Sequence, residues 1–242
     1  MNTPEELARN LAIVDDTIAA ACRRAQRSPS EITLIAVTKM HRPEAIAAVA
    51  ELGVTHIGEN KVQEFEAKQP QWSALTAKYP LRSHLIGHLQ SNKSAKAASL
   101  FDAIDSVDSL RLAERLDTAA AANERMLRVL LEIKLSEEES KNGIASEGAE
   151  IDELLEKLPG LAHLQVRGLM TVPPYLRDAE AVRPYFRRLR ELRNQYTGQH
   201  PKLKLDALSM GMTHDYGVAI EEGATEIRLG TVLFGARDYS KR

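Results

Sequence analysis

The sequence has little of several features that would assign a protein to a class at once. It contains one cysteine, Cys22, among 242 residues, so no disulfide can form within the chain, which fits a reducing cytoplasm. No apolar run approaches the roughly 20 residues that cross a bilayer, and the charged, polar start MNTPEELARN is neither a secretory signal nor a transit peptide. The formal net charge is only −2, which gives no general signal for nucleic acid or an acidic membrane. These absences favour a soluble, cytoplasmic protein.

What the sequence does contain is a regular alternation of short β-rich runs with helix-length amphipathic segments. Several of the runs are almost continuously apolar, which is typical of parallel strands covered on both faces. The eight predicted strands span residues 32–38, 55–59, 83–87, 101–107, 128–135, 165–171, 205–211 and 225–231. Eight such pairs in a chain of this length predict an α/β protein with one (β/α)8 TIM barrel, a fold of about 250 residues.

A doubly wound open sheet is the alternative, but its first turn normally carries glycines, and TKMHRP at 38–43 has none. No composition break or linker divides the chain, so we predict one domain over residues 1–242. Residues 1–30 are predicted as an additional N-terminal helix that packs on the barrel. Later helices are predicted to begin at Pro43, Asp108, near Ser146 and near Thr213.

The carboxyl ends of barrel strands share one face, which carries the active site in this fold. Polar residues gather at these predicted ends, among them Asp105 and Ser106 at the end of the fourth strand, and a charged residue, Lys39, ends the first. Such a lysine can simply extend to water. Alternatively, partial burial lowers the pKa of its amine and makes it a nucleophile that forms a Schiff base with a carbonyl compound.

The last two strands indicate what that compound carries. SMGMTHD and RLGTVLFGAR offer glycine backbone N–H groups and the hydroxyls of Ser209, Thr213 and Thr231, at the loops that commonly bind phosphate in this fold. The glycines alone would equally suit tight turns. Together with Lys39 they favour a phosphorylated aldehyde. Arg228 is predicted to point into the barrel, where it could meet a carboxylate or face the ring nitrogen of a heteroaromatic ligand.

These segments resemble a known family over about residues 8–240. The matching motifs are AVTKMHRPEAI, GENKVQE, HLIGHLQSNK, SKNGI, VRGLMTV, LSMGMTHDYGVAI and RLGTVLFGARDYS. They are similar to those of the YggS/PROSC-type pyridoxal 5′-phosphate homeostasis proteins, whose barrel resembles the N-terminal domain of alanine racemase. The resemblance implies that Lys39 holds pyridoxal 5′-phosphate (PLP) as a covalent aldimine.

The resemblance also assigns roles to other residues. It implies that Ser209, Gly230 and Thr231 bind the phosphate and that Arg228 lies at the pyridine nitrogen. The remaining predicted cofactor-binding residues are Asn60, near the cofactor face, and Gly211 and Met212, which line the site. Many members read VSKTKP where this chain reads VTKMHRP, so the resemblance assigns no role to Met40 and His41.

Two function classes remain open on the sequence. An amino-acid racemase needs a second acid/base group, which in alanine racemase is a tyrosine from a partner subunit's second domain. We expect no such domain here, because the chain ends at Arg242, and none of the six tyrosines lies in an equivalent motif. The resemblance therefore favours a protein that binds, buffers and delivers PLP without robust catalysis, and weak racemisation stays open. A Schiff-base aldolase would use the same lysine but leaves Arg228 unexplained.

Other charged motifs favour ordinary structural interpretations. We expect a monomer whose partners are PLP and apo-enzymes that receive it, with no nucleic acid or membrane partner. Five arginines at 183–193 fit the solvated face of a helix better than an RNA-binding patch. His84 and His88 are four apart, but they span a strand and a loop, so we predict no metal site there.

Overall fold

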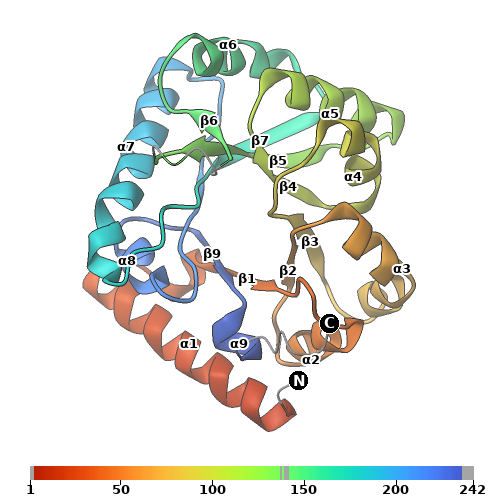
Figure 1. The fold of residues 1–242 in the computed structure, drawn as a ribbon, viewed down its shortest axis with the longest axis vertical. Coiled ribbons are helices and arrows are strands. Elements are labelled where there is room, and N and C mark those ends of the chain that lie inside the picture. The colour runs from red at the N-terminus through yellow and green to blue at the C-terminus, as the bar shows by residue number, and fades with distance from the viewer. Residues whose placement is uncertain (1–2, 137, 139–141, 236–242) are drawn as a thin grey trace.

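The computed structural model describes residues 3–136, 138 and 142–235, and it confirms the predicted barrel. Within these residues eight parallel strands form a ring in the order β4-β3-β2-β1-β9-β8-β7-β5, and β4 also pairs with β5 to close it (Figure 1). Each predicted strand overlaps an observed one. The strands are β1 (Thr33–Val37), β2 (His56–Glu59), β3 (Arg82–Leu85), β4 (Ala103–Val107), β5 (Leu127–Lys134), β7 (Leu164–Met170), β8 (Ala207–Ser209) and β9 (Glu226–Leu229).

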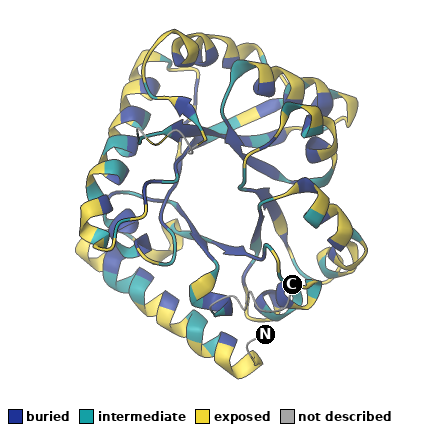
Figure 2. Ribbon diagram, viewed as in Figure 1, coloured by how far each residue is buried: buried dark blue, intermediate teal, exposed yellow. Residues whose placement is uncertain are grey.

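A short ninth strand, β6 (Ile144–Ala145), pairs with the end of β5 outside the ring and has no counterpart among the predicted strands. Helices surround the ring, with their buried faces toward the strands and their exposed faces outward (Figure 2). They are α1 (Pro4–Arg24), α2 (Pro43–Glu51), α3 (Val62–Thr76), α4 (Ser94–Leu100), α5 (Leu110–Ala122), α6 (Ala149–Lys157), α7 (Arg183–Gln199), α8 (Tyr216–Glu221) and α9 (Thr231–Phe234). No helix in this described part is both long and apolar enough to span a membrane.

Local sequence explains the start of several helices. The side chain of Thr3 accepts a hydrogen bond from the backbone N–H of Glu6, and the carboxylate of Glu6 accepts one from the backbone N–H of Thr3, so α1 begins in a capping box. Ser109 caps α5 through the backbone N–H of Leu112. The helix predicted near Ser146 begins later, at Ala149, because Gly148 takes a positive φ of 111° that no helix continues through.

The core lies mainly between the strands and the surrounding helices. Its largest fully buried side chains include Phe65, Phe101 and Phe186, and the rings of Phe65 and Phe101 stack with centroids 4.4 Å apart. The inside of the ring is different, because several of its buried side chains are polar or charged. Such groups are stable inside a protein only when they are paired, so the interior holds a set of defined polar contacts.

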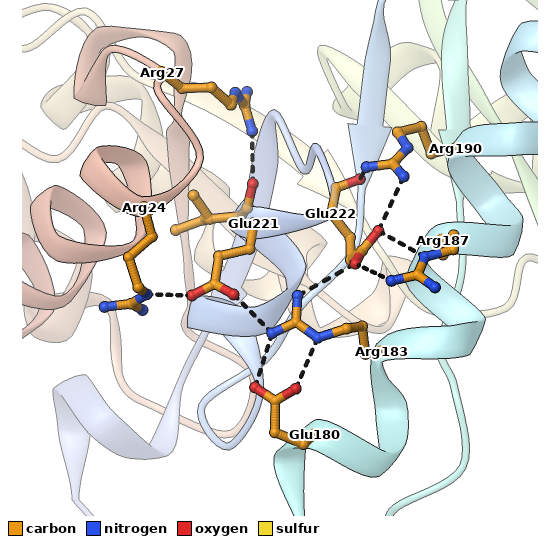
Figure 3. Close-up of polar contacts among 9 residues, drawn as sticks. Arg24, Arg27, Glu180, Arg183, Arg187, Arg190, Glu221 and Glu222 are labelled. Atoms are coloured by element: carbon orange, nitrogen blue, oxygen red, sulfur yellow. Dashed lines mark hydrogen bonds and ion pairs between the residues drawn. The ribbon is translucent and has the colours of Figure 1, made fainter.

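The N-terminal helix is fastened to the barrel by an arginine–glutamate network (Figure 3). Arg24 of α1 binds Glu221 at 2.5 Å, and Arg27 donates to the backbone oxygens of Ile220 and Ala224 at 2.9 and 2.7 Å. Arg183 of α7 also binds Glu221, at 2.7 Å. The network therefore joins α1, α7 and the end of α8.

Glu222 lies at the centre of the α7 side of this network. Its side chain is buried and accepts hydrogen bonds from Arg183 and Arg187. It also forms an ion pair with Arg190, and all three contacts are 3.1–3.2 Å long. Burial raises the pKa of Glu222, but hydrogen bonds from Arg187 and Arg183 outweigh that effect and leave the pKa lowered. The prediction that the arginines at 183–193 form a solvated helix face is therefore only partly right, because three of them bind one buried carboxylate.

Replacing Glu222 with Gln should lower the free energy of unfolding at pH 7 by about 2 kcal/mol, because three guanidinium groups lose their shared counter-charge. Denaturant unfolding measures the loss, which should shrink as the pH falls through the lowered pKa of Glu222. Glu180→Gln is the matched control, since its exposed carboxylate also binds Arg183, and its loss of stability should be clearly smaller. Equal losses in the two variants would contradict this account.

Candidate functional site

A cavity of about 350 Å³ opens at the carboxyl end of the barrel. It lies among the segments that follow β1, β2, β3, β7, β8 and β9, so it is the face at which the fold was predicted to carry its site. Its lining residues are Val37, Lys39, Asn60, Ile86, Val172, Pro174, Tyr175, Met212, Thr213, His214, Asp215, Arg228, Gly230 and Thr231. Apolar walls thus alternate with an amine, a guanidinium, an amide and hydroxyls.

Lys39 lies two residues beyond β1 and is half-buried at the cavity wall. The next two residues, Met40 and His41, are those at which the sequence differs from the VSKTKP pattern. Met40 is 55% exposed and has a positive φ of 63°. The ring of His41 packs against Phe234 of α9, with centroids 4.7 Å apart. His41 therefore joins the loop that carries Lys39 to the segment that begins with Gly230 and Thr231.

Arg228 reaches the cavity from β9 and is almost fully buried. Its guanidinium donates to the hydroxyl of Ser209 and to the backbone oxygen of Thr171, both at 2.7 Å. Burial lowers the pKa of Arg228 from its very high ordinary value, and the carboxylates of Asp105 and Glu132 oppose that change. These contacts fix the guanidinium plane at the floor of the cavity.

Glycines shape two of the walls. A Cβ on Gly87 would lie 2.4 Å from the backbone oxygen of Asn60, so the close approach that places Asn60 at the cavity requires glycine. Gly211 has a φ of +95°, and its added Cβ would lie 2.6 Å from the Cβ of Ala219. The next residue, Met212, lines the cavity and donates its backbone N–H to the carboxylate of Asp215 at 2.7 Å.

The residues predicted to bind the phosphate come from two segments that meet, the loops after β8 and β9. Gly230 and Thr231 line the cavity where α9 begins, and the hydroxyl of Thr213 accepts a hydrogen bond from the backbone N–H of Val232 at 3.3 Å. The structure thus brings the β8 and β9 loops side by side. Burial raises the pKa of Asp215, a change that its hydrogen bond from Met212 opposes.

Six of the eight predicted cofactor-binding residues line the cavity. They are Lys39, Asn60, Met212, Arg228, Gly230 and Thr231. The other two, Ser209 and Gly211, lie directly behind the wall, where both contact Arg228. Ser209 accepts from its guanidinium, and the backbone oxygen of Gly211 accepts from its backbone N–H at 3.0 Å.

The predicted mouth position of Asp105 is wrong. Asp105 is the middle residue of β4, which continues to Val107, and its carboxylate binds His84 and Arg128 at 2.8 and 3.2 Å. Arg128 also binds Glu226, the first residue of β9, so this cluster lies toward the amino ends of the strands. Strand lengths cannot be read from a run such as FDAIDSV, because polar residues inside a barrel resemble those that end a strand.

The histidines at 84 and 88 take different partners. His84 is buried between Asp105 and His56, whereas His88 is 44% exposed in its side chain and pairs with Asp108 at 3.3 Å. Within the described residues, His84, Asp105 and Glu226 lie close enough to share a metal ion, but Arg128 contacts both carboxylates. Burial, followed by the charge of His84, lowers the pKa of His56 to about 4.

Part of the cavity wall comes from residues that were not predicted from the sequence. Ile86, Val172, Pro174, Tyr175 and His214 all line it. Tyr175 is 76% exposed, and the centroid of its ring lies 5.4 Å from the centroid of the His214 ring. An aromatic residue in the proline-rich loop VPPY directly after a predicted barrel strand was a usable signal, since such loops form the rim of the site.

Comparisons with known proteins agree with this geometry. The family model of the alanine racemase N-terminal domain matches residues 13–238. The pyridoxal phosphate homeostasis protein of Escherichia coli (strain K12) is 42% identical over 241 residues, which cover 98% of this chain and 99% of that protein. The structure of PipY from Synechococcus elongatus with PLP bound is 40% identical, with a TM-score of 0.82 over 95% of this chain and 100% of PipY.

A more distant likeness concerns the fold alone. Alanine racemase of Clostridium difficile is 13% identical, with a TM-score of 0.72 over 96% of this chain and 60% of the racemase chain. The barrel architecture is therefore shared with that enzyme.

Replacing Glu132 with Gln should stabilise the protein at pH 8 by on the order of 3 kcal/mol but leave it unchanged near pH 4.5. Glu132 is buried on β5, and burial, together with the charge of Asp108, raises its pKa from 4.5 to about 7 despite Arg228. The native state therefore binds the proton more tightly, and ionisation costs stability as the pH rises from 4.5 to 7. Denaturant unfolding across this range measures the effect, and a gain independent of pH would contradict it.

Proposed function

The chain belongs to the pyridoxal phosphate homeostasis proteins, a family built on the alanine racemase N-terminal domain, and from this membership we propose that it binds PLP for intracellular cofactor homeostasis. The observation that carries the proposal is the joint presence of Lys39 and Arg228 in one cavity at the carboxyl end of the barrel. A full-length relative of 40% identity holds PLP in its solved structure, which supports the assignment.

The side chains of the cavity suit the chemistry of this cofactor. Lys39 offers an amine for an aldehyde, and Gly230, Thr231 and Thr213 gather small and hydroxyl-bearing residues for a phosphate. Val37 and Ile86 provide apolar surface for a flat ring. The cavity of about 350 Å³ has room for a molecule of this size.

When bound, PLP supplies an aldehyde that combines reversibly with amines. Lys39 acts as the amine that attaches the cofactor covalently. Arg228 would hold the ring nitrogen, and because its guanidinium stays charged and does not give up a proton, it would keep that nitrogen unprotonated and weaken the ring as an electron sink. The hydroxyl oxygen of Ser209 accepts a hydrogen bond from Arg228, so its own O–H would remain able to donate to the phosphate.

This arrangement supports a carrier better than an enzyme. An arginine at the ring nitrogen weakens the stabilisation of a carbanion, and the relatives of about 40% identity are named for homeostasis. One observation keeps racemisation as the second candidate: the phenol of Tyr175 lies at the cavity wall and could serve as an acid or base. Its 76% exposure to water argues against tight control of proton transfer.

The remaining expectations stay parts of this proposal. We propose that the protein is a cytoplasmic monomer, that residues 1–242 form one domain, and that PLP passes to apo-enzymes that require it. Residues 1–2, 137, 139–141 and 236–242 of that domain lie outside the described residues. Delivery would follow when another amine replaces Lys39 on the aldehyde, so no energy source is needed.

Lys39→Ala should abolish covalent attachment of PLP, because the variant lacks the amine. The parent protein mixed with PLP should show a visible absorbance band, and borohydride reduction should place a phosphopyridoxyl group on the Lys39 peptide by mass spectrometry. Lys96→Ala is the control, since Lys96 is an exposed lysine that pairs with Glu66, and it should behave as the parent. An adduct on another lysine in the parent protein would overturn the assignment.

The PLP-loaded protein should exchange the Cα proton of common amino acids in deuterated water no faster than PLP free in solution. Proton NMR of the amino-acid pool measures the exchange. Rapid exchange that Tyr175→Phe removes would instead establish racemase-type chemistry, because that substitution deletes only the phenol oxygen.

A further inference from the structure

A second lysine, Lys68, is buried beside the loop that carries Lys39. It belongs to α3 and is only 6% exposed, which is rare for lysine unless its charge is paired. Its ammonium contacts three acceptors: Glu59 at 2.7 Å, the backbone oxygen of Thr38 at 3.0 Å, and Glu64 at 3.2 Å. An ammonium has three N–H donors, so this environment satisfies all of them.

Each of these acceptors is tied to the backbone on one side of Lys39. The Thr38 oxygen also accepts from the backbone N–H of His41 at 3.0 Å, which closes a turn around Lys39. The Thr38 hydroxyl donates to Glu59 at 2.6 Å, and the backbone N–H of Met40 donates to Glu64. The peptide groups before and after Lys39 are thus both connected to the ammonium of Lys68.

The turn that these contacts hold is strained. Met40 has a φ of +63°, which side chains other than glycine, asparagine and aspartate seldom adopt. Its side chain is 55% exposed, so little burial compensates for the strain. A backbone conformation of this kind persists only where surrounding contacts determine it, and the surrounding contacts here converge on Lys68.

The buried carboxylate of Glu59 also depends on the charge of Lys68. Glu59 is fully buried, and burial raises its pKa, an effect that the hydrogen bond and charge of Lys68 oppose. Glu59 is followed directly by Asn60, which lines the cavity. Loss of the ammonium would therefore disturb both the Lys39 turn and the segment that presents Asn60.

We propose that Lys68 is a positioning residue, whose buried ammonium holds the turn of Thr38–Met40 so that the amine of Lys39 faces the cavity. The inference concerns the same site and rests on the proposed function for its meaning in PLP binding. The orientation of Lys39 itself can be tested without any cofactor.

The first test compares Lys68→Met, which removes the charge but keeps a long side chain, with Lys68→Arg, which restores a cation. Competitive labelling by acetic anhydride, read by mass spectrometry over a pH series, measures the reactivity of Lys39 relative to exposed Lys96 in the cofactor-free protein. In the parent the two profiles should differ. In Lys68→Met the Lys39 profile should become that of Lys96, and in Lys68→Arg it should move back toward the parent.

The second test measures PLP itself, by the visible band and by borohydride trapping. Lys68→Met should weaken PLP binding by about tenfold or more and spread the adduct to other lysines, since small displacements of a reacting group carry large penalties. The matched control is Lys78→Met, which removes an exposed lysine just beyond the end of α3 and should leave both readouts unchanged.

Glu222→Gln is the control for loss of stability alone, because Glu222 does not line the cavity. This variant should be less stable but should keep the parental labelling profile of Lys39. All variants are compared at a temperature at which circular dichroism shows them folded. The proposal is wrong if Lys68→Met lowers the thermal stability but leaves the labelling profile of Lys39 as in the parent protein. It is also wrong if Lys39 and Lys96 already have the same labelling profile in the parent protein. A parent that attaches no PLP at Lys39 defeats the proposed function, and the labelling arm still decides the role of Lys68.

Discussion

Closure of the parallel ring, through the pairing of β4 with β5, is the constraint on which the other features depend. It brings the carboxyl ends of all strands of the ring to one rim, so residues as distant in sequence as Lys39 and Arg228 share a cavity. It also removes the inside of the ring from water, where an unpaired charge is expensive. Each ionised group inside must therefore find a defined partner, and those partners determine where the functional side chains point.

The interior charges are arranged at two levels. Toward the amino ends of the strands, Arg128 lies between Asp105 and Glu226, and His84 binds Asp105 from the other side. Toward the carboxyl ends, Arg228 is held by Ser209 and Thr171 and remains part of the cavity wall. The charged groups toward the amino ends pair with one another. Toward the carboxyl ends, by contrast, the guanidinium of Arg228 remains at a surface that a ligand can reach. This difference separates a structural cluster from a binding site.

The sequence predicted the strands and named six residues that line the cavity, because both leave local signals. Apolar runs marked the eight strands of the ring, and a charged residue at the end of the first of them marked Lys39. The position of Asp105 was wrong, since the length of a strand with polar inward residues depends on its neighbours and not on its own composition. Lys68 was missed for a related reason: its partners Thr38 and Glu59 come from other elements, and only the closed ring brings them together. Ser209 and Gly211 were chosen by motif, and their contacts with Arg228 need the register of β8 and β9 to be seen.

Two lysines in one neighbourhood show how the same side chain is given different roles. Lys68 is 6% exposed with three acceptors around its ammonium, and Glu59, one of those acceptors, is itself fully buried. Such an environment engages all three N–H donors of the ammonium in contacts with the protein. Lys39 is half-buried at the wall of the cavity, which Val37 and Ile86 also line. The fold thus holds one amine in fixed contacts, and through those contacts it directs the other toward the cavity, where a carbonyl ligand can be held.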